Sequence, residues 1–234
     1  MLIDLLTAPM IADFVKTTFA VFAGAGLAFL SNAYFKRKQR RHEELASANL
    51  ATFTLSRYCN VYLSLQAELA QHRESLEADP QTGPLESLPS WVLVPPIASS
   101  GDRDIKLGFD KLHFLIKRGN ENLLGELSIC QEKFLRFRNT IDAYNEVHAR
   151  VKERVAAVAV PTPSISAESV EILAGAIDRQ KLNSLSSSIL SDIPENLAYT
   201  ESIAATLHRA LVSKFGEGEV LLRIGSTNDS STHR

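Results

Sequence analysis

The sequence predicts an all-α protein: a single N-terminal transmembrane helix, then a cytosolic antiparallel bundle of four to five helices with one long proline-rich loop. Three observations predict this class. Residues 17–35 carry no charge, apolar residues recur at helical spacing in later stretches, and most prolines lie between those stretches. The expected divisions are an outer segment (1–13), the transmembrane helix (14–35), a basic cluster (36–41), a helical domain (42–224) and a disordered tail (225–234).

The apolar stretch 17–35 is long enough for a membrane anchor. At about 1.5 Å of rise per residue, a helix of this length spans roughly 28 Å, close to the hydrocarbon thickness of a bilayer. A cleaved signal peptide is disfavoured because Asp4 and Asp13 precede the stretch and basic residues follow it. A helix in a soluble core is disfavoured because only Asn32 interrupts a surface of apolar and small residues.

The charges that flank this stretch predict its orientation. Only Lys16 precedes it closely, whereas a basic cluster follows it: Lys36, Arg37, Lys38, Arg40 and Arg41. Loops rich in Lys and Arg stay on the cytoplasmic side, so we expect the N-terminus outside and the C-terminal domain in the cytosol. The cluster either sets this topology alone or also binds anionic lipid, at about 1 kcal/mol per basic residue. A bacterial inner membrane is favoured, although an organelle outer membrane has similar requirements.

Small residues recur every four positions along the apolar stretch. Ala20, Gly24 and Ala28 share one face of a helix. Such a face lets two backbones approach closely, which favours helix pairing in lipid. The stripe predicts a homodimer formed in the membrane, unless it reflects only the frequency of Ala and Gly in membrane helices.

The domain beyond the basic cluster is acidic. Residues 42–234 hold 19 Lys or Arg against 25 Asp or Glu, which gives a formal net charge of −6. Nucleic acid is therefore not expected as a partner, because its phosphates need a positive surface. The two cysteines, Cys59 and Cys130, fall at apolar positions of expected helices, which predicts reduced core residues.

Helical spacing of apolar residues predicts the first elements of this domain. A long helix is expected at 42–76 and a shorter one at 104–118. The longest amphipathic helix is expected at 120–158, where five heptads of apolar residues form a coiled-coil-like stripe that includes Phe134 and Phe137. Such a stripe must pack on another helix.

Prolines and glycines delimit the later elements. Pro161 ends the longest helix, and a short helix is expected at 167–178. A last helix is expected to continue through Pro194 with a kink and to end at Gly216. An extended segment is expected at 220–224.

The proline-rich loop is expected at 77–104. Within it, an apolar segment holds the only tryptophan of the chain and is the candidate docking site for a cytosolic protein partner: Trp91, Val92, Leu93, Pro95 and Pro96. Either this segment folds back over the bundle as a plug, or it is exposed and docks a partner. Long loops in compact domains are often functional, and consecutive prolines pre-organise an extended peptide.

The sequence contains no recognisable catalytic motif. It has neither a phosphate-binding glycine loop nor a Gly-x-Ser-x-Gly nucleophile motif. Glu68 and His72 are four residues apart, but the paired Glu-x-x-His repeats of di-iron bundles are missing. His148 occupies an apolar position of the longest helix, where a core histidine bonded to a neighbouring helix is expected rather than a ligand. We expect no catalytic residue, metal site or cofactor.

Three hypotheses for function follow from this reading. The first is a non-enzymatic, membrane-anchored interaction or scaffold protein with a cytosolic helical bundle. The second is a membrane sensor or signalling relay, in which the helix that leaves the membrane carries a signal inward. The third is a metal-dependent enzyme within the bundle, built on Glu68, His72 and His148.

Overall fold

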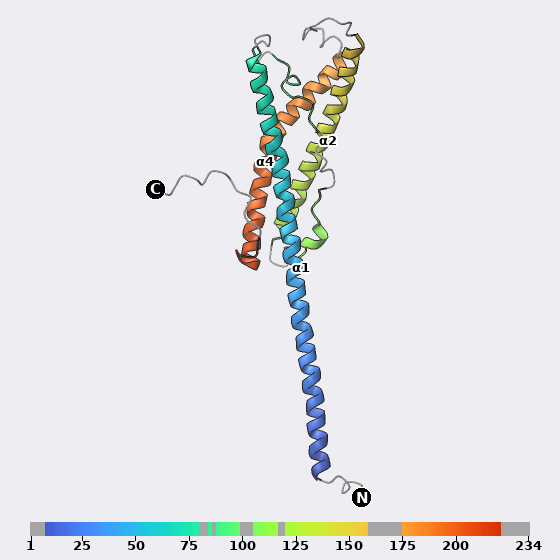
Figure 1. Cartoon of the computed structure of the whole chain (residues 1–234), viewed down its shortest axis with the longest axis vertical. Helices are drawn as coiled ribbons and strands as arrows, with labels where there is room; N and C mark the ends of the chain where they lie inside the picture. Colours follow the sequence, from blue (N-terminus) through green and yellow to red (C-terminus); the bar gives the residue numbers. More distant parts are fainter. Residues whose placement is uncertain are drawn as a thin grey trace, which may run out of the picture. The chain divides into compact units, whose positions relative to one another are not determined.

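The computed structural model describes residues 8–79, 84–85, 88–98, 105–116, 120–158 and 175–220. Three α-helices make up most of this part: α1 at Ala8–Ala78, α2 at Glu121–Val158 and α4 at Ala176–Phe215. A short 3-10 helix, η2, covers Phe109–Leu112, and no strand occurs in the described ranges. The all-α class is therefore confirmed (Figure 1). The chain divides into two units, Met1–Ala46 and Ser47–Arg234.

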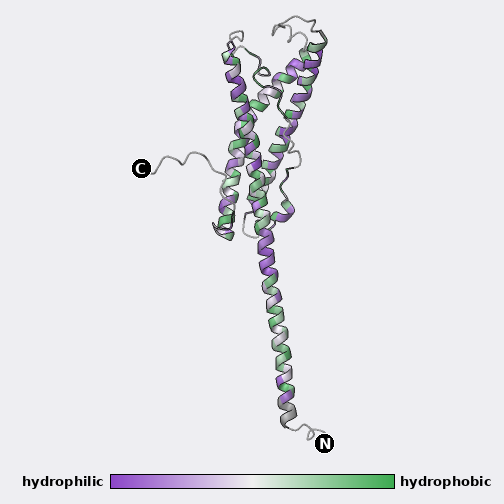
Figure 2. Cartoon of the chain, viewed as in Figure 1, coloured by the Kyte–Doolittle hydropathy of each residue, from purple (hydrophilic) through white to green (hydrophobic). Residues whose placement is uncertain are grey.

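The first unit contains the N-terminal part of α1, whose apolar side chains are exposed. Phe19 and Phe22 leave 74% and 73% of their surface accessible, and the most apolar window of the helix has none of its residues buried. Exposed apolar surface costs about 25 cal/mol per Å² in water, a cost that hydrocarbon removes. By length and composition, α1 holds a candidate membrane span. Figure 2 shows its apolar residues giving way to hydrophilic ones further along the helix.

In the second unit, α1 and α2 run in the same direction and meet through aromatic rings. The ring of Tyr58 stacks on Phe134 with 3.9 Å between centroids, and one turn later the ring of Tyr62 lies 5.1 Å from Phe137. Contacts that rise together along both helices define a parallel pair. All four side chains are almost completely buried, so these aromatic contacts form the centre of the core.

Helix α4 runs antiparallel to α2. The Lys133 ammonium lies 2.7 Å from the Glu195 carboxylate, whereas Arg150, further along α2, binds Asp178 near the start of α4. Contacts that rise along one helix and fall along the other define this orientation, which Figure 1 shows as opposite colour gradients. The predicted antiparallel bundle is therefore correct for α2 and α4 but wrong for α1 and α2.

The segment between α1 and α2 runs back along the bundle. Val94 contacts Tyr144, and Leu107, later in the chain, contacts Gln131, which is earlier in α2. Because α1 and α2 are parallel, their connection has to return over the length of the pair. The described parts of this segment, which contain no α-helix, pack along the helices as a fourth element.

The helix predicted at 104–118 is wrong. Residues 105–116 contain only the short helix η2, preceded by Gly108 with φ −85° and ψ 81°. The Leu107 amide donates to the Gln131 side chain at 2.6 Å instead of joining a helical ladder. The buried residues of this segment do not keep helical spacing: they are Leu107, Leu112, Phe114 and Leu115. With three α-helices in the described ranges, the predicted count of four to five is not confirmed.

Helix α2 confirms the amphipathic helix predicted at 120–158, with one shift of register. Phe134, Phe137, Ile141 and Tyr144 are buried as expected. The next buried residue is Val147, and His148 is only half-buried. The regular three-and-four alternation is therefore broken at this turn, because α2 turns Val147 rather than His148 towards the core.

Helix α4 continues through Pro194, as predicted. The proline is exposed, so its ring faces away from the core, and Figure 1 shows α4 changing direction along its length. The helix ends at Phe215, and Gly216 forms its C-cap, with a φ of 96° and an N–H that donates to the Val212 carbonyl at 2.9 Å. The helix predicted to end at Asp178 is corrected, because that residue lies in the first turn of α4.

Several expected elements lie outside the described residues. They are most of the outer segment, parts of the proline-rich loop, most of the short helix expected at 167–178, the extended segment beyond Val220 and the tail at 225–234.

Candidate functional site

The predicted pairing stripe lies on the exposed part of α1. Ala20, Gly24 and Ala28 are all exposed, and a Cβ added at Gly24 would meet no described atom within 4 Å. The basic cluster follows in the same helix, at Lys36, Arg37, Lys38, Arg40 and Arg41. Arg40 pairs with Glu44 at 3.1 Å across one turn, which anchors one of these cations to the helix surface.

Residues 90–98, called the Trp91 segment below, pack on the bundle through their backbone. The Tyr144 hydroxyl donates to the Val94 carbonyl, and the side-chain amide of Asn145 forms two hydrogen bonds with the backbone of Ile97. Its amide Nδ2 donates to the Ile97 carbonyl at 2.7 Å, while its Oδ1 accepts the Ile97 N–H at 3.0 Å. Two side chains of α2 thus satisfy backbone groups that the non-helical segment leaves without intrahelical partners.

The other helices hold the same segment. His72 of α1 contacts the Val92 carbonyl through Nε2 at 3.0 Å, and Ser90 contacts Ser186 of α4 with 2.8 Å between the hydroxyl oxygens. The indole nitrogen of Trp91 is shielded from solvent and finds no partner among the described residues. This geometry is that of a segment folded back over the bundle. Of the predicted docking residues, only Pro96 is exposed; Trp91, Val92, Leu93 and Pro95 are half-buried.

The three residues considered for a metal site are not brought together. His72 contacts the Trp91 segment, Glu68 lines a groove described below, and the His148 ring lies 5.8 Å from the ring of Tyr144. Burial, assisted by Lys152, lowers the pKa of His148. In the described ranges, no group of three or more His, Cys, Asp or Glu side chains is placed to hold a metal ion.

The two cysteines are buried thiols at the junction of the helices. Burial raises the pKa of Cys59 to about 12, with smaller contributions from Glu201 and Cys130. Burial also raises the pKa of Cys130, although its Sγ lies 3.5 Å from the Thr200 hydroxyl. Both thiols are therefore protonated at neutral pH, and a protonated thiol is a poor nucleophile.

An ion-pair cluster joins the end of α2 to the start of α4. Arg150 and Arg154 approach the two carboxylate oxygens of Asp178 at 3.2 and 2.5 Å. Hydrogen bonds from Arg154 and Arg150 hold the pKa of Asp178 below its ordinary value. The carboxylate also lies in the first turn of α4, where the helix dipole favours a negative charge.

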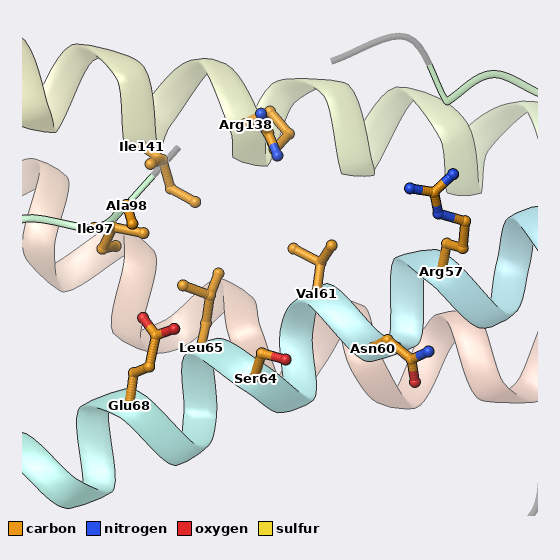
Figure 3. A pocket seen from close by; sticks show the side chains of 10 residues that line it. All are labelled: Arg57, Asn60, Val61, Ser64, Leu65, Glu68, Ile97, Ala98, Arg138 and Ile141. Carbon is orange, nitrogen blue, oxygen red and sulfur yellow. The ribbon is translucent and has the colours of Figure 1, made fainter. Parts of the chain in front are cut away.

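A groove of about 270 Å³ lies between α1, α2 and the Trp91 segment (Figure 3). Its apolar wall comes from Val61 and Leu65 of α1, Ile141 of α2, and Ile97 with Ala98. The polar lining residues are Arg57, Asn60, Ser64, Glu68 and Arg138.

Sequence reasoning missed this groove. Ile97 and Ala98 of the folded-back segment form part of its wall, and the spacing of apolar residues in the sequence does not predict where this segment lies. One signal was present: Arg138 directly follows Phe137 on the apolar stripe, which places a charge at the edge of the core.

By its fold, the described part of the chain is all-helical, and α1 holds a candidate membrane span. No protein-family model, curated protein or solved structure matches the chain.

Proposed function

We propose that the chain is a membrane-anchored, non-enzymatic interaction or scaffold protein. It crosses the membrane once, with its N-terminus outside and its helical domain in the cytosol, and a bacterial inner membrane is the favoured location. The domain binds a cytosolic protein partner close to the membrane surface.

The exposed apolar part of α1 carries this proposal. Side chains such as Phe14, Phe19 and Phe29 leave most of their surface accessible, and they precede a dense cluster of basic residues in the same helix. An uncharged apolar helix followed by such a cluster is typical of a single-span anchor whose basic side faces the cytosol.

The partner surface that we propose is the outer side of the Trp91 segment. Pro96 is exposed, and the half-buried rings of Trp91 and Pro95 offer apolar surface beside it. The bonds from Tyr144 and Asn145 fix the backbone of the segment, so a partner would meet a preorganised surface and lose little entropy in ordering it.

Site-specific photo-crosslinking in native membranes tests this surface. A benzophenone amino acid at Pro96 should yield one discrete adduct with a cytosolic protein. The matched position is Ser191, which is also exposed but lies on α4, and it should yield no such adduct. Equal adduct patterns from the two positions, or no adduct from Pro96, would contradict docking at this segment.

The relay hypothesis is the second candidate because residues 36–46, which link the apolar stretch to the bundle, are helical. A helical linker transmits rotation or tilt, whereas a flexible one does not. Insertion of four glycines after Arg41 should abolish an inward signal under the relay hypothesis. Partner binding by a scaffold would survive the same insertion.

A further inference from the structure

The groove between α1, α2 and the Trp91 segment combines an apolar wall with an uneven distribution of charge. Figure 3 shows Arg57 and Glu68 at opposite ends of the view, with Val61 and Leu65 between them on α1 and Arg138 on α2. Two guanidinium groups thus face one carboxylate among the lining residues. Among the lining residues, basic side chains therefore outnumber acidic ones, and Arg57 lies at the end away from Glu68.

Arg138 is the more buried of the two arginines that line the groove. Only 8% of the surface of this residue is accessible. A guanidinium presents five N–H donors in a planar fork, and this fork matches the two oxygens of a carboxylate. Charge-assisted hydrogen bonds in such a shielded place are stronger than those at an open surface.

The volume limits the ligand to a small molecule. The volume of about 270 Å³ lies near the lower end of the roughly 300 to 1,000 Å³ of pockets that hold drug-sized ligands, which suits a ligand of about ten heavy atoms. The apolar residues that line it favour a hydrocarbon tail, while Glu68 disfavours a second negative charge at the far end.

We propose that this groove binds a small monocarboxylate with an apolar tail of about seven carbons. The carboxylate lies between Arg57 and Arg138, and the tail lies along Val61, Leu65 and Ile141. The site belongs wholly to the second unit and does not depend on the proposed scaffold function.

Calorimetric titration of the full chain in phosphatidylcholine nanodiscs tests the ligand class, with empty nanodiscs as the blank. Octanoate should bind with a Kd of about 0.1 to 1 mM, as about ten heavy atoms at ordinary ligand efficiency would give. Octylammonium and octanedioate should each bind at least tenfold more weakly, and 1-octanol should bind more weakly than octanoate. Octanoate heats equal to the blank, or equal affinity for octanoate and octylammonium, would overturn the proposal.

Variants test the location. Arg57→Gln and Arg138→Gln should each weaken octanoate binding about tenfold, while Arg136→Gln, an exposed arginine on the same helix outside the groove, should leave it unchanged. Ser64→Phe adds a ring at an exposed lining position and should block binding without disturbing the core, which keeps the test valid if Arg138→Gln lowers stability. Binding that survives Ser64→Phe, or that falls equally with Arg136→Gln, would place the ligand elsewhere.

Discussion

Tyr58 and Tyr62 lie one turn apart on α1, and their hydroxyl groups have different surroundings. The Tyr58 hydroxyl donates to the Ile105 carbonyl at 3.1 Å, whereas the buried Tyr62 hydroxyl finds no partner among the described residues. Burial raises the pKa of both hydroxyls well above the ordinary tyrosine value, so both are neutral. A buried polar group without a partner costs about 1 to 3 kcal/mol, while a satisfied one contributes about 1 kcal/mol.

This difference predicts opposite effects of the same substitution. Tyr58→Phe should lower the free energy of unfolding by about 0.5 to 1.5 kcal/mol, because the Ile105 carbonyl loses its donor. Tyr62→Phe should leave the free energy of unfolding unchanged or raise it by about 1 kcal/mol. At this chain length the two variants should differ in Tm by several degrees, which a thermal melt followed by circular dichroism resolves. An equal loss of stability in both variants would show that the Tyr62 hydroxyl does have a hydrogen-bond partner.

Asp178 predicts a pH dependence of stability. Its pKa in the folded chain lies below 3.8, its ordinary value, because Arg154 and Arg150 hydrogen-bond the ionised form. The stabilisation is fully present above that ordinary value and is lost as pH falls through the lower folded pKa.

Asp178→Asn should therefore be less stable than the wild type at pH 6, and the difference should shrink as pH falls below about 3.8. Urea unfolding of both proteins at each pH measures this difference, and other carboxylates cancel in the comparison. A difference that stays constant from pH 6 to pH 2.5 would mean that the ion pair contributes nothing.

At the scale of elements, the returning segment between α1 and α2 is held by side chains rather than by secondary structure. Tyr144, Asn145 and Gln131 of α2 bond its backbone groups, and Leu107 and Ile97 bury their side chains beneath it. A segment of this kind depends on a few bonds, so single substitutions in α2 should release parts of it.

Asn145→Ala should release the Ile97 end of the segment. The substitution removes both hydrogen bonds to the Ile97 backbone and should lower the free energy of unfolding by about 1 to 3 kcal/mol. Hydrogen exchange of the Ile97 amide should become much faster, while exchange of the Leu107 amide, held by Gln131, should change little. Uniform acceleration at both amides would indicate global destabilisation instead of local release.

The sequence predicted the long helices well and the returning segment poorly. Helices α2 and α4 follow from apolar spacing that persists over many turns, and Gly216 marks an end that glycine geometry makes readable. The failure at 105–116 has a tertiary cause. Ile105, Phe109 and Leu112 imitate helical spacing, but the Leu107 amide donates to Gln131 of α2, a contact that no local pattern contains. The parallel order of α1 and α2 was missed for the same reason, since spacing within a helix says nothing about its direction in the bundle.

The groove illustrates the same limit at a candidate site. Arg57 and Arg138 are far apart in the chain, and only the packing of α1 on α2 places both in one lining. The pairing stripe and the basic cluster, in contrast, belong to one helix. Their residues could therefore be named from the sequence, while their roles stay predictions.

At the scale of the whole molecule, the pairing stripe makes a prediction about assembly. Gly24→Leu places a bulky side chain in the middle of the stripe and keeps the helix apolar, so membrane insertion should survive and helix pairing should fall. Leu27→Ile lies off the stripe and serves as the control. An in-membrane reporter of helix association, at matched expression, measures both. Equal association of wild type and Gly24→Leu would assign any oligomer to the helical domain.

Labelling of introduced cysteines with an impermeant maleimide most directly tests the proposed topology, a single-span anchor with the helical domain in the cytosol. Asp13→Cys and Ser191→Cys both place the thiol at exposed positions, while Cys59 and Cys130 are buried and give a low background. In intact cells we predict labelling of Asp13→Cys alone, and labelling of Ser191→Cys only after the membrane is permeabilised. Ready labelling of Ser191→Cys in intact cells would contradict a cytosolic location of the helical domain.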